Sequence, residues 1–222
     1  MTLAVFHACN ALRGCELWIT DGTRPNTRIL RDIVRGNVGS NPQNLTALGD
    51  GRVLFAAHQP PGHTGFDYQP WISDGTAAGT RRIRRTATHA VGMAPRDFTP
   101  LGDGRATFIA RGDGGATQEL TMWVTGGARV GTRPILSVEQ SAGAFTGLGN
   151  GLAVFSHTTA EHGAELWVTD GTPRRTRLRR DINPGGEASH SYARAFTVLG
   201  RFPARHALVR ALAGVGDADG GG

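Results

Sequence analysis

The chain has 222 residues, a formal net charge of +6, and 33 glycines and 11 prolines spread along its length. That distribution excludes a mainly helical protein and favours short strands joined by tight turns. No apolar run approaches the length of a membrane-spanning helix, and the N-terminus lacks the basic start and apolar core of a secretory signal. The positive charge suits anionic partners such as acidic polysaccharide, envelope phosphate or nucleic acid, without choosing among them.

A tryptophan-containing phrase recurs four times in chain order. It reads Glu-Leu-Trp-Ile-Thr-Asp-Gly-Thr at 16–23, Gln-Pro-Trp-Ile-Ser-Asp-Gly-Thr at 69–76, Thr-Met-Trp-Val-Thr-Gly-Gly-Ala at 121–128 and Glu-Leu-Trp-Val-Thr-Asp-Gly-Thr at 165–172. Its tryptophans are Trp18, Trp71, Trp123 and Trp167, at intervals of 53, 52 and 44 residues. Such an interval fits one four-stranded propeller blade.

A second phrase marks hairpins with the same rhythm. Leu-Gly-Asp-Gly occupies 48–51 and 101–104, and Leu-Gly-Asn-Gly occupies 148–151. Asp-Gly and Asn-Gly between apolar runs predict two-residue hairpin turns, because both central positions need positive φ. The second unit then divides into strands at 44–48, 53–57, 69–73 and 80–84. We therefore predict an all-β, propeller-like domain over 1–210, with about four blades of four antiparallel strands, and a flexible glycine-rich tail at 211–222.

The repeated polar residues have a local structural interpretation. An Asp-Gly turn lets the carboxylate accept backbone N–H groups while glycine takes the left-handed conformation. The tryptophans are expected in the core between neighbouring units. Calcium is an open alternative, but one carboxylate per turn is too few for a cation that takes six to eight oxygens, so we predict no cofactor. The residues concerned are Asp21, Asp74 and Asp170, with Gly22, Gly75 and Gly171.

The best copy of the phrase carries a family resemblance. It runs His-Gly-Ala-Glu-Leu-Trp-Val-Thr-Asp-Gly-Thr over 162–172 and is followed by Asp-Ile-Asn-Pro-Gly at 181–185. This resembles the bacterial ELWxxDGT repeat family over residues 1 to about 200. The resemblance implies a propeller-like fold and an extracellular or cell-surface location, but no assigned activity. The third copy has Gly126 in place of the aspartate and the second has Gln69 and Pro70 in place of Glu-Leu, which argues against an obligatory metal ligand.

Both ends of the repeat region bear on whether a ring closes. Residues 3–6 stand where a second strand belongs, so the first unit lacks its own first strand. Residues 195–199 read as a first strand that could complete that unit and close a four-bladed ring. Residues 207–210 read as a surplus second strand, which favours the alternative of a fragment from a longer array with exposed strand edges.

Cysteine and histidine offer candidate metal or redox chemistry. Cys9 and Cys15 could face each other across a hairpin, but their spacing matches no zinc or redox motif. We expect free, partly buried thiols, with a disulfide as the alternative. Paired histidines follow two second strands, and a polar loop role is favoured over a metal site because no repeated carboxylate completes the set. These pairs are His58 with His63 and His157 with His162.

Two arginine clusters occupy equivalent places in the second and fourth units. Because residues two apart in a strand share a face, each cluster should divide between two faces, which favours a solvated structural role over a specific nucleic-acid site. The clusters are Arg81, Arg82, Arg84 and Arg85, and Arg174, Arg175, Arg177, Arg179 and Arg180.

A regular frame with variable loops favours a non-enzymatic binding or scaffolding module that recognises a glycan or a protein. One alternative is a glycan-active propeller enzyme, a hydrolase or lyase, which would need convergent carboxylates. The scattered candidates for that role are Glu119, Glu139 and Glu161. A second alternative is a fragment of a longer repeat protein with no independent function.

Overall fold

The computed structural model describes residues 2–58, 68–83, 93–112, 119–138, 142–185 and 190–200. In these residues the fold is all-β, with four antiparallel sheets and one short 3₁₀ turn, η1 (Pro173–Arg175). None of the described segments forms a helix with the length and hydropathy needed to cross a bilayer.

Each sheet is one repeat unit whose strands pair in chain order. Sheet 1 contains β1 (Ala4–Asn10), β2 (Gly14–Thr20) and β3 (Arg28–Arg31). Sheet 2 contains β4 (Gln43–Ala47), β5 (Val53–His58), β6 (Tyr68–Ser73) and β7 (Arg81–Arg82). Sheet 3 contains β8 (Arg96–Pro100), β9 (Ala106–Arg111), β10 (Leu120–Thr125) and β11 (Arg133–Ser137). Sheet 4 contains β12 (Gly143–Gly147), β13 (Ala153–Thr159), β14 (Gly163–Thr169) and β15 (Arg177–Arg180).

The predicted strands of the second unit agree with β4, β5 and β6 to within one residue. The fourth is shorter than predicted: β7 covers two residues, and position 84 lies outside the described residues. Sheet 1 has three strands, as expected for a unit without its own first strand. Residues 207–210 and the tail at 211–222 also lie outside the described residues.

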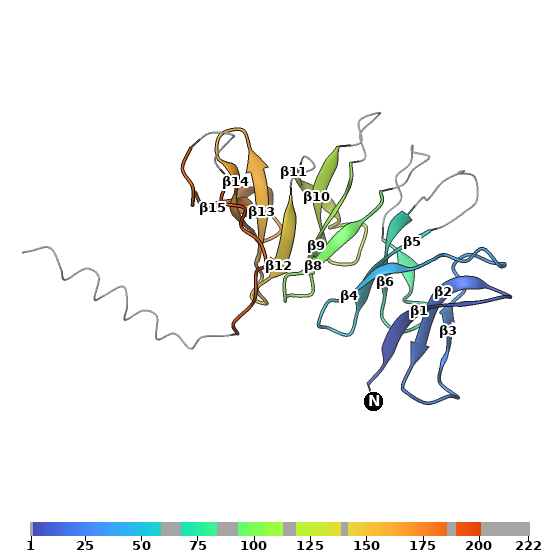
Figure 1. The fold of residues 1–222 in the computed structure, drawn as a ribbon. Coiled ribbons are helices and arrows are strands. Elements are labelled where there is room, and N and C mark those ends of the chain that lie inside the picture. The colour runs from blue at the N-terminus through green and yellow to red at the C-terminus, as the bar shows by residue number, and fades with distance from the viewer. Residues whose placement is uncertain are drawn as a thin grey trace, which may run out of the picture.

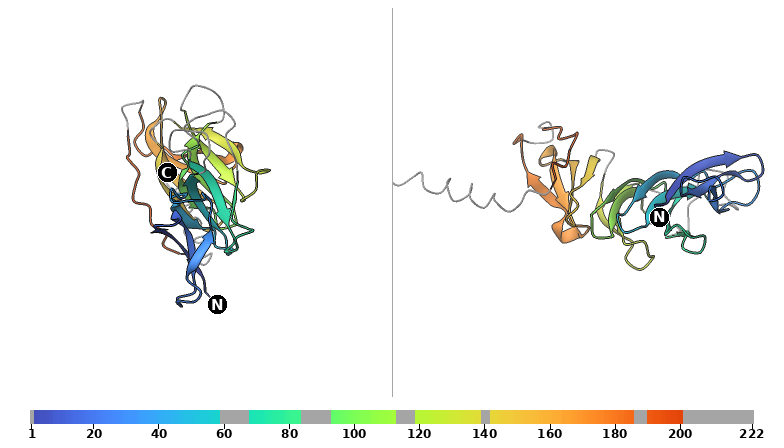
Figure 2. Two further views of the ribbon diagram at one scale, coloured as in Figure 1. Left: turned by 90° about the vertical axis from the view of Figure 1, so that its right-hand side faces the viewer. Right: turned by 90° about the horizontal axis from the view of Figure 1, so that it is seen from below.

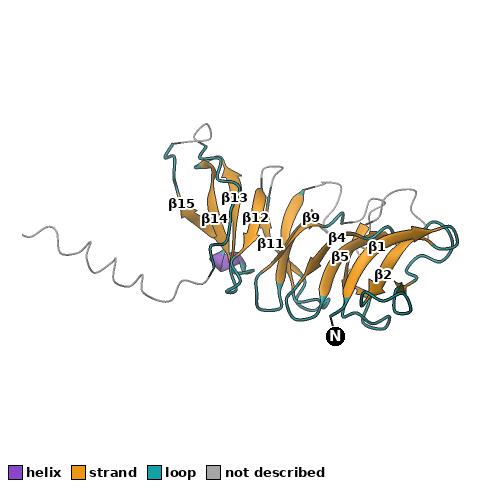
Figure 3. Ribbon diagram, turned by 60° about the horizontal axis from the view of Figure 1, so that its bottom comes forward, coloured by secondary structure: helices purple, strands orange, loops and turns teal. Residues whose placement is uncertain are grey.

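The sheets stand side by side in chain order, with sheets 1 and 4 at opposite ends of the row (Figures 1 and 3). Figure 2 shows the same row from the side and from below. The first strands lie next to one another, β4 against β8 and β8 against β12. Residues 195–199 belong to no sheet, so the described residues do not close a ring and sheet 1 is not completed.

The core lies between the sheets. In every sheet a second-strand phenylalanine is paired with the third-strand tryptophan, as in Phe55 with Trp71. The tryptophan face of one sheet packs on the aliphatic face of the preceding sheet: Phe108 and Trp123 of sheet 3 meet Leu54 and Ile72 of sheet 2. Leu17 and Ile19 of sheet 1 make the same kind of contact with Phe55 and Trp71 of sheet 2, and Ile109 and Val124 of sheet 3 do so with Phe155 of sheet 4.

The expectation of free thiols is wrong, because Cys9 and Cys15 form a disulfide. The two residues are direct partners in the β1–β2 ladder, so the hairpin brings their side chains together. A sequence spacing of six could not show this, because it depends on which face and register the hairpin adopts.

Candidate functional site

The Asp-Gly-Thr turns connect the third and fourth strands, and their aspartates are hydrogen-bonded within the turn. Asp74 Oδ1 accepts both the backbone N–H and the hydroxyl of Thr76, at 2.9 and 2.7 Å. The hydrogen bond from the Thr76 side chain is the main reason that the pKa of Asp74 lies below its ordinary value. The same two hydrogen bonds join Asp21 to Thr23 and Asp170 to Thr172.

A hydroxyl pair braces the same turn in all four sheets, including the third, which lacks the aspartate. Thr125 and Thr132 have their Oγ1 atoms 2.7 Å apart, and the backbone N–H of Gly127 donates to Thr125 Oγ1. The equivalent pairs are Thr20 with Thr27, Ser73 with Thr80 and Thr169 with Thr176. The hydroxyls therefore hold the turn where Gly126 replaces the acid.

The turn glycines make the contact between sheets. A β-carbon on Gly127 would overlap Cδ1 of Ile72, and one on Gly171 would lie 2.8 Å from Cγ2 of Val124. Gly75 is looser, with Ile19 Cδ1 at 3.7 Å from the same position. Each of these three glycines also has a positive φ. Gly22, the equivalent in sheet 1, has no atom within 4 Å of that position.

The glutamate that opens the phrase has a role that sequence reasoning missed. Glu16 is fully buried and accepts the backbone N–H groups of Ile33, Val34 and Ser40, together with the Ser40 hydroxyl. This carboxylate fastens the connection between sheet 1 and sheet 2. The recurrence of Glu before Leu-Trp was the available signal, but its hydrogen-bond partners lie 17 to 24 residues away.

Glu165 is the counterpart in sheet 4 and accepts backbone N–H groups from Ile182 and Ser191, at 2.9 and 3.0 Å. Burial acts most strongly on its pKa and raises it, but the hydrogen bonds together outweigh burial, so the pKa lies below its ordinary value. At Glu16 burial prevails over the hydrogen bonds, and the pKa is raised. Gln69 is buried at the equivalent position of sheet 2.

The histidines that the structure describes do not gather into one site. His157 is buried edge-on against Trp167, with ring centroids 4.9 Å apart, and His58 lies beside Tyr68. His162 faces Asp181 at 3.2 Å. His63 lies outside the described residues.

One group of potential metal ligands occurs among the described residues: His7, Cys9 and Cys15 lie within 4.8 Å of one another. The two sulfurs are bonded to each other, so this group offers one imidazole rather than three ligands.

Two of the three candidate carboxylates of a glycan-active enzyme are described by the structure, and they lie on separate sheets. Glu119 precedes β10 in sheet 3, and Glu161 occupies the β13–β14 turn in sheet 4; both are exposed. Glu139 lies outside the described residues.

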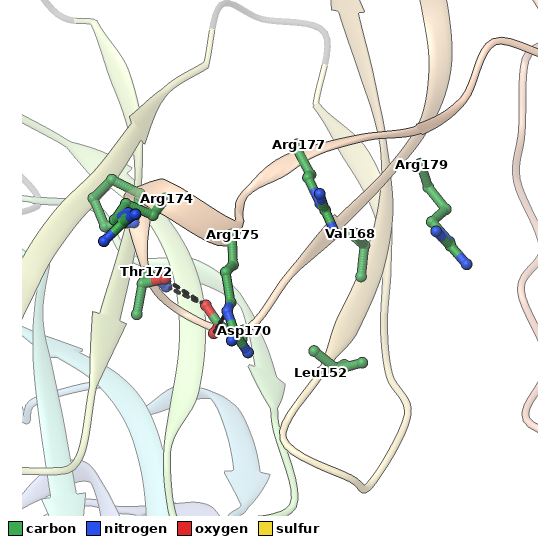
Figure 4. A pocket seen from close by; sticks show the side chains of 9 residues that line it. Leu152, Val168, Asp170, Thr172, Arg174, Arg175, Arg177 and Arg179 are labelled. Carbon is green, nitrogen blue, oxygen red and sulfur yellow. Dashed lines mark hydrogen bonds and ion pairs between the residues drawn. The ribbon is translucent and has the colours of Figure 1, made fainter.

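A pocket of about 1050 Å³ lies on the outer face of sheet 4 (Figure 4). Leu152 and Val168 supply its apolar part, and Asp170, held by Thr172, lies near Arg175 at 3.7 Å. Four of the five arginines in the second predicted cluster line it: Arg174, Arg175, Arg177 and Arg179. The predicted division between two faces is therefore wrong for this cluster, since η1 brings Arg174 and Arg175 to the side where β15 presents Arg177 and Arg179. In the first cluster, positions 84 and 85 lie outside the described residues.

Arginines at two internal sheet contacts show what such a face can bind. Arg52 of sheet 2 donates to the carbonyl oxygens of Gly104 and Gly126 in sheet 3, at 2.8 and 2.7 Å. Arg31 of sheet 1 donates to those of Ala77 and Thr80 in sheet 2, at 2.9 and 2.6 Å. Guanidinium groups beside an aliphatic surface here bind the backbone carbonyls of a neighbouring turn.

No protein-family model and no curated protein matches the chain. Among solved structures it is similar to a puromycin hydrolase, with 18% identity and a TM-score of 0.50 over 79% of this chain and 26% of the hydrolase. It is also similar to a prolyl endopeptidase, with 14% identity and a TM-score of 0.51 over 79% of this chain and 24% of the peptidase. Both are β-propeller peptidases, so the likeness shows a propeller-like fold. The chain spans about a quarter of the length of each.

Proposed function

We propose that this chain is a non-enzymatic binding and scaffolding module built from propeller blades, and that its ligand is a protein. Its binding surface is the outer face of sheet 4, and the observation that carries the proposal is the pocket of about 1050 Å³ lined by four arginines and an aliphatic surface. Leu152 and Val168 give it apolar contact area, and the guanidinium groups give it directional donors.

A protein ligand is favoured over a glycan because the same chemistry already operates inside the molecule. Arg31 and Arg52 both donate to backbone carbonyls next to aliphatic side chains that pack on the following sheet. A sugar would satisfy the guanidinium donors but would leave the aliphatic part of the pocket poorly covered. A β-turn or sheet face of another protein would satisfy both.

The proposed setting is extracellular or at the cell surface. Its support is the resemblance to the ELWxxDGT repeats together with the Cys9–Cys15 disulfide, since disulfides persist mainly in oxidising compartments. We also propose membership of that family and the blade arrangement of a propeller, of which the four sheets form a consecutive stretch.

Site-specific photo-cross-linking in the producing cells tests the binding surface. A photoreactive residue replaces Leu152 in the pocket, and a matched one replaces Val130, which is 91% exposed on a turn of sheet 3. We expect a discrete protein adduct at position 152 and none at position 130. Arg177→Ala combined with Arg179→Ala should remove most of the adduct, and Arg28→Ala combined with Arg133→Ala, on β3 and β11, should leave it.

The outcomes separate the alternatives. An adduct that carries carbohydrate would replace the protein ligand with a glycan. Equal labelling at positions 152 and 130 would contradict the assignment of the binding surface. So would an adduct at position 152 that persists when Arg177 and Arg179 are both replaced by alanine. Turnover of glycan substrates by the purified chain, lost in Glu119→Gln or Glu161→Gln, would establish the enzyme alternative.

A further inference from the structure

The two outer faces of the row are the two halves of a contact that the molecule makes three times internally. At each internal contact a turn glycine of one sheet lies over an isoleucine or valine of the preceding sheet: Gly75 over Ile19, Gly127 over Ile72 and Gly171 over Val124. The next valine in this series is Val168, which borders the open pocket of sheet 4. The glycine left over is Gly22 of sheet 1, with no atom within 4 Å of its β-carbon position.

The aromatic half of the contact is also unfilled on sheet 1. Trp18 points to the face opposite Leu17 and Ile19, because neighbouring residues of a strand alternate between faces. Leu17 and Ile19 pack on sheet 2, whereas Trp18 lies on the outer face and is only partly buried. Of its equivalents at the internal contacts, Trp71 and Trp123 are 4% and 1% exposed, and Trp167 is partly buried.

Residues 192–200 repeat the positive-φ spacing found around the first strands β4 and β8, but they form no strand and pair with no second strand. Residues 192–194 lie beside the start of β12, where they share a small pocket with residues 142–144, as β8 lies beside β4. The segment 196–200 reads Phe-Thr-Val-Leu-Gly, against Phe-Thr-Pro-Leu-Gly at 98–102 and Phe-Thr-Gly-Leu-Gly at 145–149. Positive φ recurs at the same spacing around β4, around β8 and in this segment: 41, 44 and 49; 94, 97 and 102; and 192, 195 and 200.

Sheet 1 is complementary to this unpaired segment, because it lacks a first strand. In sheet 2 the first strand β4 pairs Thr46 with Leu54 and Ala47 with Val53 of β5. By the repeat, Thr197 corresponds to Thr46 and Val5 of β1 corresponds to Leu54. Thr197 opposite Val5 is therefore the register in which the unpaired segment would complete a first sheet.

The arginines that donate hydrogen bonds between sheets also have counterparts on the two outer faces. Arg31 donates to the carbonyls of Ala77 and Thr80 in the turn of sheet 2. Its equivalent in sheet 4 is Arg180, which pairs with Leu166 as Arg31 pairs with Leu17. The matching acceptors in the turn of sheet 1 are the carbonyls of Arg24 and Thr27.

We propose that the partner at the sheet 4 face is a second copy of this chain, joined head to tail. The 195–199 segment of one copy pairs with β1 of the other, and the Gly22 turn of that second copy covers Val168. This rests on the proposed binding function and names its ligand. Sheets 1 and 4 lie at opposite ends of the row, so the two halves meet between copies (Figure 1). If both ends of each copy engage, two copies make an eight-sheet ring, within the usual four to eight blades of propellers.

Mixed cysteine cross-linking tests the register. Thr197→Cys and Val5→Cys proteins are purified separately, mixed and oxidised, and the product is mapped by mass spectrometry to separate it from the Cys9–Cys15 disulfide. We expect a covalent dimer joined through positions 5 and 197. The matched control mixes Thr197→Cys with Phe6→Cys, which points to the other face of β1 and should give little product. A double variant that cross-links only within one chain would establish ring closure by a single copy and overturn the proposal.

Two glycine substitutions test the packing of the Gly22 turn on the sheet 4 face without any added cysteine. Gly22 and Gly49 both have positive φ, +91° and +86°, and both have open β-carbon positions in one chain, so alanine strains both equally. Gly22→Ala should weaken self-association about tenfold or more, because the corresponding β-carbons at two of the three internal contacts, on Gly127 and Gly171, would clash. Gly49→Ala should leave it unchanged.

Equal self-association of the two glycine variants, or a wild-type chain that stays monomeric at high concentration, would overturn the second copy as partner. The proposed function would survive that result if position 152 still cross-linked a different protein in cells. Both proposals would fail if position 152 labelled nothing while the purified chains still dimerised through another surface.

Discussion

The contact between sheets 2 and 3 differs from the outer face of sheet 1 in one respect: the first is filled and the second is not. Gly127 is pressed against Ile72 and Trp123 is almost fully buried, whereas Gly22 is open and Trp18 is partly exposed. The same residue types therefore do different work according to whether a neighbouring sheet is present. Substitutions at matched positions, measured on dilute protein, isolate the contribution of the contact itself.

The largest expected effect comes from the tryptophans. Trp123→Ala should lower the free energy of unfolding by about 3–5 kcal/mol, because it removes a buried aromatic and leaves a cavity between two sheets. Trp18→Ala should cost less than half as much, since its side chain is only partly buried. Urea unfolding followed by far-UV circular dichroism measures both, and equal costs would mean that the sheets do not pack as described.

The turn glycines should give the next largest difference. Gly127→Ala and Gly22→Ala share the strain of a positive φ, but only the first places a methyl group against Ile72. We expect Gly127→Ala to be the more destabilising by about 1–3 kcal/mol. If thermal unfolding showed the same loss for both variants, the glycines would serve the turn alone.

A third comparison is between two glutamates of sheet 4, the buried Glu165 and the exposed Glu161. Glu165→Gln should cost about 2 kcal/mol, because an amide nitrogen would face one of the N–H donors of Ile182 and Ser191. Glu161→Gln, exposed in the same sheet, should stay within about 0.5 kcal/mol. A small cost at position 165 would show that the carboxylate does not fasten the connection.

Acid should destabilise the Asp-Gly-Thr turn of sheet 2 more than the equivalent turn of sheet 3, which has Gly126 in place of the aspartate. The pKa of Asp74 is lowered by its Thr76 hydrogen bonds, so its contribution is present above the unfolded pKa and is lost as pH falls through the folded value, below about pH 4. Asp74→Ala should flatten the acid dependence of unfolding. Gly126→Asp, at a position with room for a β-carbon, should steepen it. Unfolding curves at several pH values test both variants, and unchanged slopes would contradict the role of the carboxylates in the turns.

The sequence predicted the all-β class, the strand order of a unit and the incomplete first sheet, because hairpin dipeptides and the tryptophan phrase are local signals. It could not predict the disulfide or the partners of Glu16, which depend on the register of β1 and on a connection folding back over β2. The arginine pocket was missed because periodicity within a strand does not include η1, which adds Arg174 and Arg175 to the face of β15.

The central claim is that the outer faces of sheet 1 and sheet 4 are complementary halves of one repeated contact. Sedimentation equilibrium of the wild-type chain tests this claim most directly. The mass should rise with concentration to twice that of one chain and no further, and Gly22→Ala should shift the transition to higher concentration. A mass that stays at one chain over the whole range, or grows without limit, would contradict the closed head-to-tail pair.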